Sequence, residues 1–106
     1  DESLTRVWVK RQKVPDGVIS ARHLYVVRVP EVRHRKLFES MHSSRIGVNL
    51  HYMPVHLQPY YRKFGFKEGD YPNAEKYSQE AISLPLYPSL TDSEQDHVIA
   101  TLRSLI

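Results

Sequence analysis

The sequence predicts an α+β fold in which helices pack on one face of a small mixed or antiparallel sheet. The first observation is the run HLYVVRV at residues 23–29, whose apolar side chains suit a strand buried on both faces. The second is the apolar spacing of three and four after Pro30 and again after Thr91, which is the spacing of helices. The third is the length of 106 residues, which suits one domain with one core.

Composition narrows the class of protein. The absence of cysteine excludes disulfides and thiolate metal clusters and fits a reducing, cytoplasmic compartment. No apolar run approaches the roughly 18 residues of a membrane span, so we expect a soluble chain that does not interact with membranes. Residues 1–50 carry ten Lys and Arg against five Asp and Glu, whereas residues 51–106 carry five against seven. This asymmetry either attracts phosphate-bearing ligands or is ordinary solvated surface.

The N-terminal part of the chain is expected to form strands. Residues 1–19 read as an initial strand and turn, with alternation at residues 6–11 and turn chemistry in the Pro-Asp-Gly run at residues 15–17. Residues 23–29 give the clearest strand pattern. We expect this strand at the centre of the sheet, covered on both faces.

A helix is predicted directly after this strand. Pro30 opens it, Glu31 lies in its first turn, and the pattern continues to about residue 44. Leu37, Phe38 and Met41 are expected to form its buried stripe.

A further strand is predicted where this helix pattern ends, over residues 48–52. Alternation would direct Val48, Leu50 and Tyr52 toward the core and leave Asn49 and His51 pointing away from it. Such a parity suits a ligand-facing His51.

Four elements are expected in the rest of the chain. Residues 56–66 are expected to form a loop with a short helical turn, followed by a helix from Pro72 to about Ala81 that the spacing of Ala74, Tyr77 and Ala81 supports. A strand is expected at residues 82–86, limited by Pro85. The last helix begins with the capping box of Thr91 and Glu94 and is expected to bury Val98, Leu102 and Leu105.

The stretch GVNLHYMPVHLQPYY at residues 47–61 carries more hydrogen-bonding and stacking groups than a core strand needs, and it reads as half of a binding site. As metal ligands, His51 and His56 would need a third partner, and none stands at a recognisable spacing. No metal site is therefore predicted. The two histidines either act as acid and base or are hydrogen-bonded structural residues.

The run YYRKF at residues 60–64 interleaves aromatic rings with cations. This composition suits a single-stranded nucleic-acid surface, an aromatic hinge against a neighbouring domain, or a groove for the base or diphosphate of a nucleotide. Because no nucleic-acid recognition module is present, we do not expect a nucleic-acid partner. Motifs of activated nucleophiles and of dinucleotide or phosphate loops are also absent, so the chain holds no complete set of catalytic groups.

Three runs in this order resemble the C-terminal part of the DegT/StrS-type sugar aminotransferases: residues 23–29, residues 47–66 and residues 71–91. The resemblance covers about residues 20–106 and is closest to spore coat polysaccharide biosynthesis proteins and the pseudaminic-acid pathway transaminase. Members of this family are fold-type I, pyridoxal-phosphate enzymes that convert nucleotide-linked keto-sugars to amino-sugars. Where the family commonly has an aromatic before the HLY motif, this chain has Arg22.

The resemblance implies that residues 1–106 are the single C-terminal small domain of such an enzyme, without the large domain that binds pyridoxal phosphate. No lysine here stands in the family's Schiff-base context, so we expect neither cofactor nor activity in this chain alone. The full-length enzyme is expected to be a homodimer. The resemblance places a group of residues at the sugar-nucleotide cleft or in the strand before it: His51, Tyr52, His56, Gln58, Asn49, Tyr25 and His23.

The sequence also permits a second reading. A sheet with helices on one face leaves its other face without a cover, and such a face could bind a protein or an anionic polymer. The chain would then be a free-standing interaction module.

Overall fold

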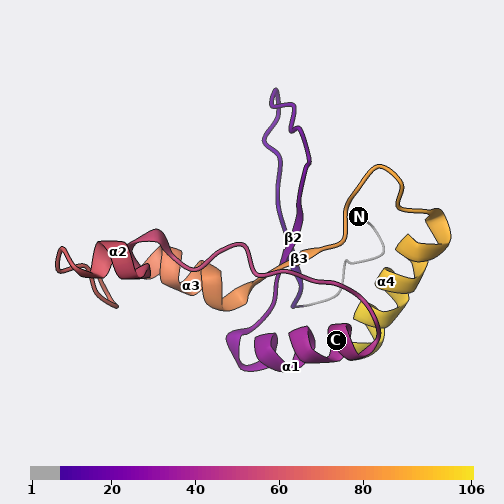
Figure 1. Ribbon diagram of the computed structural model, residues 1–106. Coiled ribbons are helices and arrows are strands. Elements are labelled where there is room, and N and C mark those ends of the chain that lie inside the picture. The colour runs from indigo at the N-terminus through magenta and orange to yellow at the C-terminus, as the bar shows by residue number, and fades with distance from the viewer. Residues whose placement is uncertain (1–7) are drawn as a thin grey trace.

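The structure is a computed structural model that describes residues 8–106. Its described residues form one antiparallel sheet in the order β1-β2-β3 (Figure 1). The strands are β1 (Lys10–Arg11), β2 (Tyr25–Arg28) and β3 (Ala81–Leu84). The central position predicted for the strand at residues 23–29 is confirmed, although the strand is shorter. Of the strand predicted at residues 6–11, only the last two residues pair, and Arg6 and Val7 lie outside the described residues.

Helices occupy two regions of the molecule. They are α1 (Glu31–Ser43), the 3-10 helix η2 (Val55–Leu57), α2 (Pro59–Arg62), α3 (Pro72–Glu80) and α4 (Asp92–Leu105). Figure 1 shows α1 and α4 beside the sheet, whereas α2 and α3 extend to the left, and we call residues 53–80 the side arm. The α+β class is confirmed. None of the described helices is long and apolar enough to span a membrane.

The core lies between the sheet and the pair α1 and α4. Because Val27 pairs with Ile82, these two side chains share the face of the sheet that is fully buried. Both helices contribute buried side chains at spacings of four, as their apolar stripes predict. The helical members of the core are Leu37, Met41, Val98 and Leu102.

Local sequence signals account for where these elements begin and turn. The predicted capping box of α4 is confirmed, since Thr91 accepts a hydrogen bond from the Glu94 N–H and donates its own N–H to the Glu94 carboxylate. The predicted turn at residues 15–17 is also confirmed. Gly17 has φ +79°, and the Val18 N–H donates to the Pro15 carbonyl at 3.2 Å. This turn lies in the long β1–β2 connection that projects above the sheet in Figure 1.

The strand predicted at residues 48–52 is wrong. Only Asn49 pairs with the sheet, through two backbone hydrogen bonds with Ser83 of 2.8 and 3.1 Å. Val48 is buried as predicted, but Leu50 and Tyr52, which the alternation placed toward the core, are exposed.

The pairing stops because both neighbouring positions on β3 are blocked. Antiparallel strands form hydrogen-bonded pairs at every second residue, so the next partners of this segment would be Pro85 and Ala81. Pro85 has no N–H to donate. The Ala81 N–H already donates to the Tyr77 carbonyl as the cap of α3, and the Ala81 carbonyl accepts a hydrogen bond from His34 Nε2 at 2.9 Å.

The residues whose spacing predicted α3 differ in burial. Ala74 and Tyr77 are exposed, whereas Ala81 is buried and begins β3 instead of ending the helix. The central strand, predicted to be covered on both faces, is covered unequally: Val27 is fully buried on the core face, whereas Val26 on the opposite face is half-buried. Apolar periodicity predicted that α3 and the central strand exist. The burial of their side chains depends instead on how far the side arm extends beyond the sheet.

Truncation of the core should be costly. Leu102→Ala is expected to lower the free energy of unfolding by about 2–5 kcal/mol, because this side chain is fully buried and its removal leaves a cavity. Leu50→Ala is the matched control, since Leu50 is 47% exposed. It should change the free energy by roughly 0.5 kcal/mol or less. Urea unfolding followed by circular dichroism compares the two, and equal losses would contradict the core described above.

Candidate functional site

The candidate site begins where residues 49–52 leave the sheet edge. The Asn49 backbone pairs with Ser83, whose side chain is 3% exposed and lies on the face opposite the core. His51 is half-buried on that same face. Its Nδ1 shares a hydrogen bond of 2.8 Å with the Ser83 hydroxyl, which fixes the orientation of the ring.

Accessible groups surround this histidine. The Asn49 side chain is exposed, and Tyr52 is 70% exposed with its ring centroid 4.6 Å from that of His51. Tyr52 therefore does not face the core. Asn49, His51 and Tyr52 together present an amide, an imidazole and a phenol at one edge of the sheet, a set that can donate and accept hydrogen bonds with a polyhydroxylated ligand.

His56 occupies a different environment, inside the side arm. It is 7% exposed, and its Nε2 lies 3.3 Å from Oε2 of Glu75, within ion-pair distance but outside hydrogen-bond geometry. Its ring also meets the Tyr71 ring edge-on, with centroids 4.9 Å apart. These contacts make His56 an internal group of the arm rather than an accessible one.

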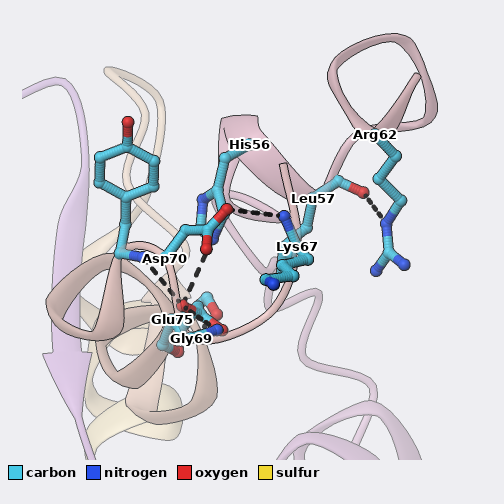
Figure 2. Close-up of polar contacts among 9 residues, drawn as sticks. His56, Leu57, Arg62, Lys67, Gly69, Asp70 and Glu75 are labelled. Carbon is cyan, nitrogen blue, oxygen red and sulfur yellow. Dashed lines mark hydrogen bonds and ion pairs between the residues drawn. The ribbon is translucent and has the colours of Figure 1, made fainter. Parts of the chain in front are cut away.

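Glu75 connects His56 to the loop before α3. Figure 2 shows its carboxylate beside His56 and Gly69. The carboxylate accepts the Gly69 N–H at 2.8 Å and the Tyr71 N–H at 3.3 Å. The Gly69 hydrogen bond is the main cause that holds the pKa of Glu75 below its usual 4.5; the Tyr71 N–H and His56 act in the same direction, against burial, which raises it.

Gln58 joins the two short helical turns of the arm. It follows η2 and caps α2, and its carbonyl accepts the N–H groups of Tyr61 and Arg62. The Arg62 side chain in turn donates from Nε to the Leu57 carbonyl at 2.8 Å (Figure 2). The loop with a helical turn predicted for residues 56–66 is confirmed and contains two such turns.

His23 and Tyr25 lie apart from these groups. His23 is exposed just before β2, and Tyr25 pairs with Leu84, so its side chain is on the core face of the sheet. The structure thus brings Asn49, His51 and Tyr52 together, places His56 and Gln58 in the side arm, and separates both sets from His23 and Tyr25. The ligand-binding roles of all seven remain predictions.

Two partners of these residues carried no signal in the sequence. Ser83 lies 32 positions from His51, and Glu75 lies 19 positions from His56. Neither spacing belongs to a helix or strand period, so only the fold brings these pairs together.

The aromatic side chains of the arm form a chain of ring contacts. Tyr60 meets Tyr61 and Phe64 edge-on with centroids 5.2 and 5.4 Å apart, and Phe66 lies between Tyr61 and Tyr71. Four of these rings remain substantially exposed, namely Tyr60, Tyr61, Phe64 and Tyr71. An exposed aromatic surface of this kind is typical of a segment that docks on another protein surface.

Comparisons with known proteins identify the family. The sequence profile of the DegT/DnrJ/EryC1/StrS aminotransferase family matches residues 2–103. The chain belongs to this family. The resemblance carried by residues 23–29, 47–66 and 71–91 is thereby confirmed.

Individual relatives and solved structures agree with this assignment. Spore coat polysaccharide biosynthesis protein SpsC of Bacillus subtilis (strain 168) is 42% identical over 99 residues, covering 88% of this chain and 25% of SpsC. The PLP-form of Spr1654 from Streptococcus pneumoniae, described as a sugar aminotransferase, has a TM-score of 0.90 at 28% identity, covering 98% of this chain and 28% of Spr1654. S. venezuelae DesV also has a TM-score of 0.90 at 28% identity, covering 97% and 28%.

This chain spans about a quarter of the length of the curated relatives that it matches. A lysine that holds pyridoxal phosphate is activated by desolvation or by a neighbouring cation, whereas all six lysines of this chain lie exposed.

Glu75 should contribute to stability in a pH-dependent way. Because its folded pKa is lowered, the contribution is fully present above the usual 4.5 and is lost as the pH falls through the folded value. Glu75→Gln should therefore be less stable than wild type near neutral pH, and the difference should shrink in acid. Denaturant unfolding across the range from about pH 7 to about pH 3 measures it.

A matched control is Glu68→Gln, since Glu68 is exposed. Its stability should follow that of wild type at every pH. Hydrogen exchange adds a local readout, because the amides of Gly69 and Tyr71 should exchange faster only in Glu75→Gln. A pH dependence that is the same in both variants would contradict the role of Glu75.

Proposed function

We propose that this chain is the substrate-side, C-terminal domain of a pyridoxal-phosphate-dependent aminotransferase that aminates a nucleotide-linked keto-sugar for surface or spore coat polysaccharide synthesis. The observation that carries the proposal is the match of nearly the whole chain to about a quarter of longer family members, among them SpsC. The polar edge formed by Asn49, His51 and Tyr52 supports a ligand-facing role.

The proposal divides the chemistry between two parts of the protein. Pyridoxal phosphate serves as the electron sink in amino-group transfer. Because the lysines of this chain are exposed, we expect the lysine that attaches the cofactor in the rest of the polypeptide. The role of this chain is then to bind and orient the sugar and to exclude water. His51 suits the first task, because Ser83 holds its ring in one orientation.

The side arm is proposed to dock on the large domain of the same protein. Its exposed aromatic rings would bury apolar area there, and the contact between His56 and Glu75 keeps them in a defined arrangement. The other partners in the proposal are the nucleotide-sugar and a second copy of the full-length enzyme, in the cytoplasm. An interaction module would also expose such rings, and the two functions differ in whether the complete protein transfers an amino group.

The complete reading frame provides the direct test. Protein expressed from it is expected to form an amino-sugar from glutamate and a UDP-linked keto-sugar, detected by mass spectrometry. The 106-residue chain alone is expected to give no product and no cofactor absorbance, because its lysines lack an activating environment. Product from the short chain, or none from the complete protein with any nucleotide-linked keto-sugar, would refute the proposal.

His51 should affect substrate affinity in the complete protein. His51→Ala is expected to raise KM for the keto-sugar about tenfold with little change in kcat, because it removes a hydrogen-bonding group that binds substrate throughout the reaction. His97→Ala is the control, since His97 is exposed on α4 and hydrogen-bonds only the Ser44 carbonyl among described residues. Steady-state kinetics of both variants distinguish the roles, and equal KM values would argue against a substrate contact at His51.

A further inference from the structure

A cationic depression lies on the face of the sheet opposite the core. It encloses about 320 Å³ and is bounded by β1 and the residues after it, by β2, and by Tyr77 of α3. Four of its seven lining residues are cations, and none is a carboxylate: Lys10, Arg11, Lys13 and Arg28. None of the residues discussed above as candidate sugar contacts lines it.

The sheet register brings two of these charges, those of Lys10 and Arg28, to the same face, whereas Arg11 pairs with Val27 and so directs its side chain to the core face. Lys10 is paired directly with Arg28 across β1 and β2, so the two side chains leave the same face of the sheet. Like charges in directly opposed positions destabilise a strand pair. The repulsion between the two cations decreases when an anion binds between their side chains.

Arg28 is held in place by α3. Its Nε donates to the Glu80 carboxylate at 3.0 Å, and its guanidinium lies 5.7 Å from the centroid of the Tyr77 ring. The Arg28 side chain remains 36% exposed. A preorganised guanidinium of this type binds phosphate oxygens with little loss of side-chain freedom.

Glu80 balances the charge of Arg28 but not that of the two lysines. Lys10 and Lys13 are exposed, and no described carboxylate lies within ion-pair distance of either. The depression therefore keeps an excess of positive charge at its rim, where mobile ammonium groups can close on an anion as point charges.

We propose that this depression binds the diphosphate group of the nucleotide-linked sugar. The proposal rests on the proposed function for the identity of the ligand, whereas the anion site itself rests on the charges and shape described here. A diphosphate matches several cations gathered around one small concavity. A nucleic acid would instead need a cationic track that follows its backbone over several nucleotides.

Binding of inorganic pyrophosphate to the 106-residue chain tests the site without reference to catalysis. Isothermal titration should detect one site that weakens as salt is added. The double variant Lys10→Gln/Lys13→Gln should bind about tenfold more weakly or worse, because two charge-assisted contacts are lost. The matched control Lys36→Gln/Lys67→Gln removes the same charge from exposed positions that do not line the depression, and it should bind within about twofold of wild type.

A second measurement covers the case in which the double variant does not fold. In wild-type chain, amide NMR shifts on addition of pyrophosphate should concentrate at residues 10–13 and Arg28. Shifts scattered over the surface, no binding at all, or equal weakening in both double variants would overturn the proposal.

Binding of further ligands shows which chemical group the depression recognises. UDP should bind like pyrophosphate or better, uridine should not bind, and a short single-stranded oligonucleotide should bind more weakly than UDP. Tighter oligonucleotide binding would overturn the proposal in favour of a nucleic-acid surface. The two proposals fail separately: pyrophosphate binding without amino-sugar formation by the complete protein refutes the function, whereas amino-sugar formation without pyrophosphate binding at these residues refutes the site.

Discussion

The pair of backbone hydrogen bonds between Asn49 and Ser83 is the contact on which the functional side of the molecule depends. It attaches the segment after α1 to the sheet at a single residue, with Val48 in the core on one side and His51 directed toward Ser83 on the other. Because pairing cannot continue at Pro85 or Ala81, the chain leaves the sheet at once. The same restriction therefore exposes Tyr52 and allows the side arm to extend beyond the edge.

Within the side arm, a polar contact takes the place of an apolar core. α3 has no fully buried side chain, and polar contacts hold it at both ends: Glu75 accepts N–H groups of the preceding loop and lies against the buried His56, and Glu80 accepts a hydrogen bond from Arg28 of β2. His56 Nε2 is buried without a hydrogen-bond partner among the described residues, and the Glu75 carboxylate 3.3 Å away is the charged group that lies against it. The arm thus keeps its aromatic rings outward while remaining anchored, which suits a surface that docks on a further domain.

The two faces of the sheet serve different purposes. One face carries Val27 and Ile82 against α1 and α4, and its apolar character accounts for the fold. The other carries Ser83 beneath His51 and, farther along, Lys10 beside Arg28. Since a β-strand alternates its side chains between faces, the same short strands both bury the core and present polar groups to a ligand.

The sequence by itself determined the fold class, the extents of α1 and α4, and the family, because these follow from apolar periodicity, capping residues and a long specific motif. It placed residues 48–52 in a strand because alternation describes local geometry and not whether a partner strand has free N–H groups. Only the tertiary structure decided that Tyr52 is exposed, that His56 lies against Glu75 and that His51 meets Ser83. Contacts between residues so far apart in the chain depend on where the elements pack, and no local pattern records that.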